Sequence, residues 1–73
     1  MRLHNATATF PDPDHAEDAK TYLLAQEFNE ADIVIEQQIS GALLTVHSDT
    51  IIEMREAVDV LRNYGGTDIQ VSE

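Results

Sequence analysis

Hydrophobic and polar residues alternate in four short stretches of the chain, and two longer stretches between them have helical spacing. The alternating stretches are Leu3–Phe10, Ile33–Ile39, Ala42–His47 and Asp68–Ser72. A period of two is typical of a strand with one buried face. In the longer stretches apolar residues recur three or four positions apart, as in amphipathic helices. These helical stretches are Asp14–Phe28 and Thr50–Tyr64.

The resulting order, βαββαβ, predicts an α+β protein with a ferredoxin-like fold. Two helices would cover one face of a four-stranded antiparallel sheet, giving a two-layer sandwich. Right-handed connections predict the strand order 4-1-3-2, with Ile33–Ile39 and Asp68–Ser72 at the two edges. A chain of 73 residues fits one domain, residues 1–73.

Capping residues mark where the expected helices begin and end. Asp12–Pro13 should open the first helix, because Asp accepts hydrogen bonds from free helix N–H groups and Pro fits the first turn. Thr50 and Glu53 form a capping box for the second helix. Gly65–Gly66 should end that helix, and Asn29 or a neighbour should end the first.

The same spacing predicts which side chains are buried between the sheet and the helices. From the strands we expect Ala6, Ala8, Phe10, Ile33, Ile35, Ile39, Leu44, Val46, Ile69 and Val71. From the helices we expect Ala16, Ala19, Leu23, Met54, Ala57, Val58 and Leu61. Ile52 and Val60 lie off this helical stripe and are expected at the surface.

The chain is strongly acidic, with 14 Asp and Glu against 4 Lys and Arg and a net charge of −10 at pH 7. Nucleic acids and anionic membranes require a basic surface, so we expect neither as a partner. The sequence has no apolar run of the ~18 residues that a membrane span needs. Its start also lacks the apolar stretch of a signal peptide, which predicts a cytoplasmic location.

Residues that carry catalysis or bind metals form no recognisable pattern. Cysteine is absent, and His4, His15 and His47 lack the His-x-His and His-Glu-x-x-His spacings of metal sites. Hydrolase and nucleotide-binding motifs are also missing. An acid–base pair of His47 with Glu36 or Asp68 across the sheet is the enzymatic alternative. We therefore predict that the protein is not an enzyme and has no catalytic residue, cofactor or metal ligand.

The sheet face that the helices leave open is the candidate interaction surface. Its candidate residues are Thr7, Thr9, Val34, Glu36, Leu43, Thr45 and His47. RNA-binding proteins of this fold stack bases on aromatic side chains of this face, and none is expected here. A face rich in threonine can remain solvated or pack against a second copy, and both alternatives are open at this point.

The stretch GALLTVHSDTIIEMREAVDVLRNYGGTDIQV, Gly41–Val71, resembles the second half of small bacterial domains of the heat-induced general stress protein family. Ala6–Ile35 is similar in layout to their first half: a strand, an acidic helix, Phe28 after the helix, and a strand that begins Asp-Ile. Glu27 departs from the pattern, since such domains place Gly before the aromatic residue. The resemblance implies a stress-related bacterial accessory domain in the cytoplasm. It carries over no catalytic residue.

Two functions fit these observations. The leading one is a non-enzymatic protein-interaction or regulatory module whose partner is a second copy, in a homodimer, or another protein. A core of this size supplies only about 3–5 kcal/mol, and oligomerisation is a usual source of further stability. The alternative is an ACT-like sensor that binds a small metabolite between a helix and a strand at a subunit interface, which rests on analogy of fold.

Overall fold

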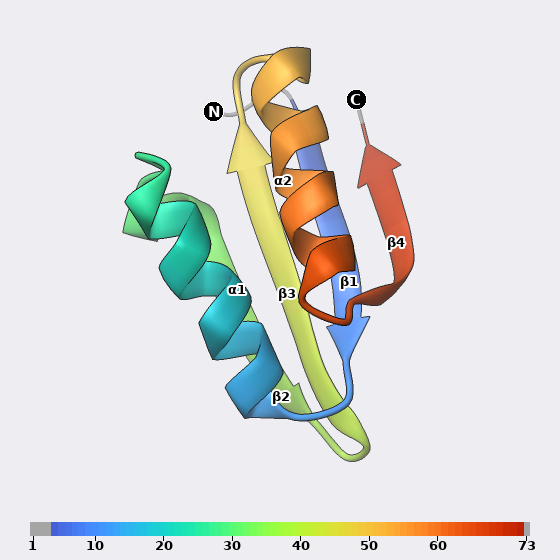
Figure 1. Ribbon diagram of the computed structural model, residues 1–73. Helices are drawn as coiled ribbons and strands as arrows, with labels where there is room; N and C mark the ends of the chain where they lie inside the picture. Colours follow the sequence, from blue (N-terminus) through green and yellow to red (C-terminus); the bar gives the residue numbers. More distant parts are fainter. Residues whose placement is uncertain (1–3, 73) are drawn as a thin grey trace.

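The computed structural model describes residues 4–72 as a four-stranded sheet with two α-helices on one face (Figure 1). Its strands are β1 (His4–Phe10), β2 (Ile33–Gln38), β3 (Gly41–Ser48) and β4 (Thr67–Ser72). Its helices are α1 (Pro13–Ala25), the short 3₁₀ helix η1 (Glu30–Asp32) and α2 (Ile51–Asn63). Leu3, which we expected in the first strand, lies outside the described residues.

All three strand pairings are antiparallel. The strand order is β2-β3-β1-β4, so β2 and β4 form the edges. Listed from the β4 edge, these neighbours read 4-1-3-2. A register shift between Thr7 and Thr9 interrupts the pairing of β1 with β4. Asp68 lies in the shifted part of β4 and has a φ angle of 50°. The molecule is therefore an α+β protein with a four-stranded antiparallel sheet.

The two α-helices begin where the capping residues predicted. The side chain of Asp12 accepts a hydrogen bond of 2.9 Å from the backbone N–H of His15. Thr50 Oγ1 accepts one of 3.1 Å from the backbone N–H of Glu53. The capping box is modified, because the backbone N–H of Thr50 donates to Ser48 Oγ at 3.2 Å rather than to Glu53. Ser48 Oγ in turn donates to the Glu53 carboxylate at 2.8 Å.

Both helices end in the same six-residue arrangement, the Schellman motif, but with different residues at its left-handed position. After α2 this position is Gly65, with a φ angle of 93°, and the N–H of Gly66 donates to the Leu61 carbonyl. After α1 it is Glu27, with a φ angle of 72°, and Phe28 donates to the Leu23 carbonyl. The predicted extension of α1 to Phe28 is therefore wrong, because the backbone reverses at Glu27 rather than at Asn29.

The core contains most of the side chains expected from the spacing. The buried apolar residues are Ala6, Ala8, Phe10, Ala16, Ala19, Leu23, Ile33, Ala42, Leu44, Val46, Met54, Ala57, Val60 and Leu61. Ile35, Val58 and Ile69 are only partly buried against them. Six of these fourteen residues are alanines, which allow the helices to approach the sheet closely.

Three predictions about the core are wrong. Ile39 is 108% exposed, because β2 ends at Gln38 and Ile39 lies in the hairpin turn. Val71 is 47% exposed, since it lies on the edge strand β4 where α2 covers the sheet incompletely. Val60 was expected at the surface but is only 8% exposed, because it faces α1 rather than the sheet.

Candidate functional site

The structure brings the residues of the predicted interaction face together on three neighbouring strands. In one row across the strands, Val34 lies opposite Thr45, and Thr45 lies opposite Thr7. In the next row, Leu43 joins two neighbours, Glu36 on β2 and Thr9 on β1. His47 lies opposite Asn5 farther along. The strand residues between them, such as Leu44 and Val46, point to the helices, so this set points away from them.

The open face carries little charge for a chain with a net charge of −10. Among its seven candidate residues Glu36 is the carboxylate, and it lies on the edge strand β2. The centre consists of threonines and Leu43, all partly accessible. Most of the acidic residues instead lie on the helices and their flanking turns, on the other side of the sheet.

The enzymatic alternative required His47 to meet Glu36 or Asp68 on this face. The partner of His47 in the sheet is Asn5, whereas Glu36 lies opposite Leu43. His47 lies four residue steps along β3 from Leu43, which corresponds to roughly 13 Å. Thr9 pairs with both Leu43 and Thr67. Asp68, which follows Thr67, therefore lies at the Leu43 end of the sheet, away from His47. The structure therefore does not bring His47 together with Glu36 or Asp68.

The other two histidines also lie apart. Nδ1 of His15 is 2.7 Å from Oδ1 of Asp12 at the start of α1. This hydrogen bond raises the pKa of His15 above its usual 6.5 and lowers the pKa of Asp12 below its usual 3.8. His4 begins β1, and its Nδ1 is buried with no hydrogen-bond partner among residues 4–72. Within the same residues no three His, Asp or Glu side chains converge as metal ligands would.

A groove between α1 and α2 is a second candidate site, which the residue pattern of the chain does not indicate directly. The groove has a volume of about 520 Å³. Its lining residues are Tyr22, Gln26, Phe28, Glu56, Asp59, Val60, Asn63 and Tyr64. The chain has only two Tyr, two Phe and no Trp, so every aromatic side chain except the buried Phe10 lines this groove.

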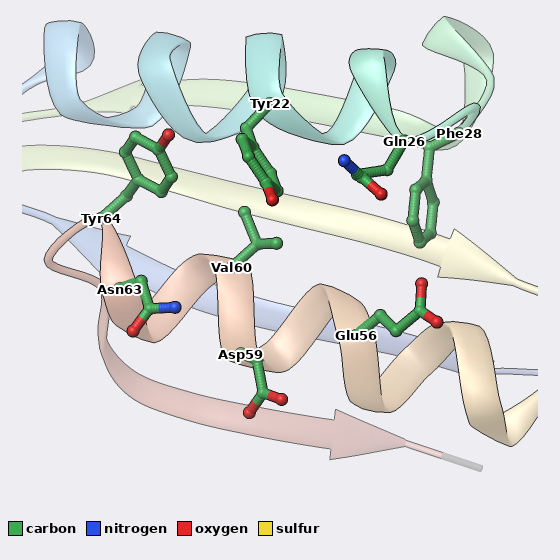
Figure 2. Close-up of a pocket in the computed structure, with 8 residues that line it drawn as sticks. All are labelled: Tyr22, Gln26, Phe28, Glu56, Asp59, Val60, Asn63 and Tyr64. Carbon is green, nitrogen blue, oxygen red and sulfur yellow. The ribbon is translucent and has the colours of Figure 1, made fainter.

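The two ends of the groove differ in chemistry (Figure 2). At one end the rings of Tyr22 and Tyr64 approach from opposite helices, with centroids 5.8 Å apart and planes tilted by 43°. At the other end Glu56 extends from α2 toward Phe28. Asp59 points away from α1, and its Oδ1 lies 3.9 Å from Nη1 of Arg62.

The three aromatic residues of the groove belong to two separate helical stretches of the sequence. Tyr22 and Phe28 border the buried stripe of α1, and Tyr64 follows the stripe of α2. The signal that could have identified the groove is that all three are aromatic. Large rings at the margins of two helical stripes meet when the helices lie side by side on one sheet.

No helix in the described part of the chain has the length and apolar character that a membrane crossing requires. Comparison of the chain with protein-family models, with curated proteins and with solved structures finds no match. The resemblance to the heat-induced general stress protein family therefore stays a prediction.

Proposed function

We propose that this chain is a small, non-enzymatic interaction module of the ferredoxin-like fold, and that it acts as a homodimer through its open sheet face. The observation that supports this proposal is the low charge of that face. The same proposal assigns it an accessory, stress-related role in the bacterial cytoplasm, as the family resemblance implies.

The distribution of charge favours a second copy at the sheet face rather than at the helices. Two chains that each carry −10 repel one another, and the repulsion is largest where their carboxylates approach closely. If the sheet faces pack together, the acidic helices point outward on both sides of the dimer. Burying threonine and Leu43 at the centre costs less than burying charges, whereas packing helix against helix would bring carboxylates of like charge together.

The size of the face predicts a reversible dimer. Four strands spaced about 4.8 Å apart, with about six residues each, give a footprint of roughly 400 Å² per copy. Two such footprints amount to roughly 800 Å² of projected area, which is at the low end of protein–protein interfaces, where weak and transient contacts lie. We therefore expect an equilibrium between monomer and dimer that depends on concentration. Salt should favour the dimer, because it screens the repulsion between the two acidic chains.

A light-scattering measurement of mass over a dilution series, at about 0.05 M and 1 M salt, tests this proposal. The test variant is Thr45→Asp, which puts a charge at the centre of the face. Burying this unpaired charge should weaken the dimer by about 3 kcal/mol, or more than 100-fold. Thr21→Asp is the matched control, because Thr21 is exposed on α1 and the change in charge is the same.

A wild type that dissociates on dilution, with Thr45→Asp monomeric and Thr21→Asp unchanged, is the expected result. A wild type that stays monomeric at millimolar concentration in 1 M salt would refute the homodimer. If Thr21→Asp dissociates the dimer as strongly as Thr45→Asp does, general repulsion explains the effect and the sheet-face interface is refuted; if Thr21→Asp alone dissociates it, the helices form the interface.

A second candidate function is a small-metabolite sensor, and the groove between α1 and α2 favours it. Ligand sites are concave, mostly apolar and furnished with a few polar groups. The aromatic rings and Glu56 supply both features. The groove lies between two helices of one chain, so such a sensor would differ from the ACT-like arrangement between a helix and a strand at a subunit interface.

A further inference from the structure

We propose that the groove between α1 and α2 binds a small organic cation, in which an ammonium or guanidinium group is joined to an apolar, flat body. This inference deepens the second candidate function and does not depend on the homodimer, because the groove and the open sheet face lie on opposite sides of the sheet.

The aromatic rings determine where the apolar body would lie. Tyr22 is 43% exposed, and its ring faces Tyr64 across the groove with a centroid separation of 5.8 Å. At this separation the two rings contact each other in a tilted rather than a parallel arrangement, so a third group would pack on the exposed side of the pair. Val60 lies between the two helices beside these rings and provides an apolar floor (Figure 2). A flat hydrocarbon body would therefore be in contact with apolar surface on more than one side.

Glu56 and Phe28 determine where the charged group would lie. Both belong to the groove lining, and Figure 2 shows the carboxylate of Glu56 directed toward the ring of Phe28. A cation at this end can form a charge-assisted hydrogen bond with the carboxylate and lie over the face of the ring. Gln26, which follows the last residue of α1 and lies between the two ends of the groove in Figure 2, has an amide oxygen that can accept a hydrogen bond from the same cation.

The charges around the groove disfavour an anionic ligand. None of the groove-lining residues in the described chain is Lys, Arg or His. Asp59 adds a second carboxylate at the rim, although it is directed away from α1 and lies near Arg62. The net charge of −10 also favours cations over anions outside the groove, since it attracts cations and repels anions over about a Debye length.

The experiment is a titration of the ¹⁵N-labelled full chain, followed by NMR at 0.15 M salt. Three probes share one phenyl body and differ in charge: phenethylamine is a cation, 2-phenylethanol is neutral and phenylacetate is an anion. We expect phenethylamine to shift the backbone signals of Tyr22, Glu56 and Tyr64 in a saturable way. The alcohol should bind at least about tenfold more weakly, and phenylacetate should cause no shifts.

Two variants with the same change in net charge locate the site. Glu56→Gln should weaken phenethylamine binding about tenfold, so that the amine binds no better than the alcohol. Glu17→Gln is the control, because Glu17 is exposed on α1 and does not line the groove. If both variants weaken binding equally, general attraction between the acidic chain and the cation explains the effect, and the proposed site is refuted.

Other outcomes would also overturn the proposal. The alcohol and the amine could bind equally well to the wild type, or no probe could cause shifts up to about 10 mM. If Tyr22→Ala instead lowers the mass in solution, the groove is an interface between two copies. Because the homodimer is tested separately by mass, loss of probe binding with an intact dimer refutes the cation site alone.

Discussion

Glu27 holds a backbone conformation that favours glycine, and replacing it should stabilise the protein. Its φ angle of 72° lies in the left-handed region, as does the 93° of Gly65 at the same position after α2. In that region the Cβ of an L-residue crowds the carbonyl oxygen, at a cost of about 1–2 kcal/mol. Glu27 is exposed, and no hydrogen bond of its side chain offsets this cost among the bonds of the described residues.

The Glu27→Gly variant should gain about 0.5–1 kcal/mol in free energy of unfolding. Glycine removes the strain of about 1–2 kcal/mol, but the unfolded chain gains conformational freedom worth about 0.5–1 kcal/mol. The hydrogen bonds that end the helix, from Glu27 to Leu24 and from Phe28 to Leu23, come from the backbone and should persist. For a chain of this length the gain corresponds to a rise in Tm of about 3–6 °C.

The assay is thermal unfolding followed by circular dichroism, supported by a urea titration at pH 7. Glu27→Gln keeps the Cβ but removes a negative charge from the end of a helix, where the dipole disfavours it. Gly65→Ala is the reciprocal variant, because a Cβ at Gly65 would meet its nearest neighbour, His15, at an ordinary 3.8 Å. It should lose about 1 kcal/mol through backbone strain alone.

This reasoning is refuted if Glu27→Gly unfolds at or below the wild-type temperature. It is also refuted if Glu27→Gln gains as much as Glu27→Gly, because charge rather than backbone conformation would then explain the effect.

Two further predictions concern the cap of α1 and the β2–β3 hairpin. In Asp12→Asn, the pKa of His15 measured by NMR should fall back toward 6.5, because its raised value comes first from the hydrogen bond to Asp12; an unchanged pKa would contradict the contact. The raised pKa of His15 contributes stability that is fully present below pH 6.5 and is lost as the pH rises through the pKa of the folded state. The lowered pKa of Asp12 contributes stability that is present above pH 3.8 and is lost as the pH falls through the pKa of the folded state. The wild type should therefore exceed Asp12→Asn in free energy of unfolding most between pH 3.8 and pH 6.5. Gly41→Ala should lose about 2 kcal/mol or more in thermal unfolding, because the added Cβ would overlap the backbone carbonyl oxygen of Phe10. Ser40→Ala, at the exposed neighbouring position, is the control and should change the free energy of unfolding by less than about 0.5 kcal/mol. Equal Tm values for Gly41→Ala and Ser40→Ala would contradict the proposed overlap with the Phe10 carbonyl oxygen.

The sequence predicted the central strands best. Ala6, Ala8 and Phe10 of β1 and Leu44 and Val46 of β3 are fully buried as expected. Both strands have a neighbouring strand on each side, and the helices cover one face of both. Every second side chain is therefore buried, and apolar and polar residues alternate strictly. The polar positions between them identified the open face for the same reason.

Prediction was less successful wherever a residue's surroundings come from another part of the chain. Ile39 and Val71 have the spacing of core residues, but Ile39 lies in the turn after β2 and Val71 lies on an edge strand that α2 covers incompletely. Val60 was expected at the surface because it lies off the helical stripe that faces the sheet, but α1 covers it from the side. The groove was missed for this reason, because Tyr22 and Tyr64 meet only when two helices separated by two strands lie together.

The position of β1 at the centre of the sheet has a consequence for the order in which the domain is made. β1 is the first strand to be synthesised, yet it needs β3 and β4 as neighbours. It ends at Phe10, and β4 begins at Thr67, so at about 5–20 residues per second the ribosome delivers the second neighbour about 3–11 s later. During this interval β1 presents an unpaired edge to other nascent chains. The acidic helices made in the same interval repel other copies of this chain, which carry the same net charge of −10, until β4 pairs with β1.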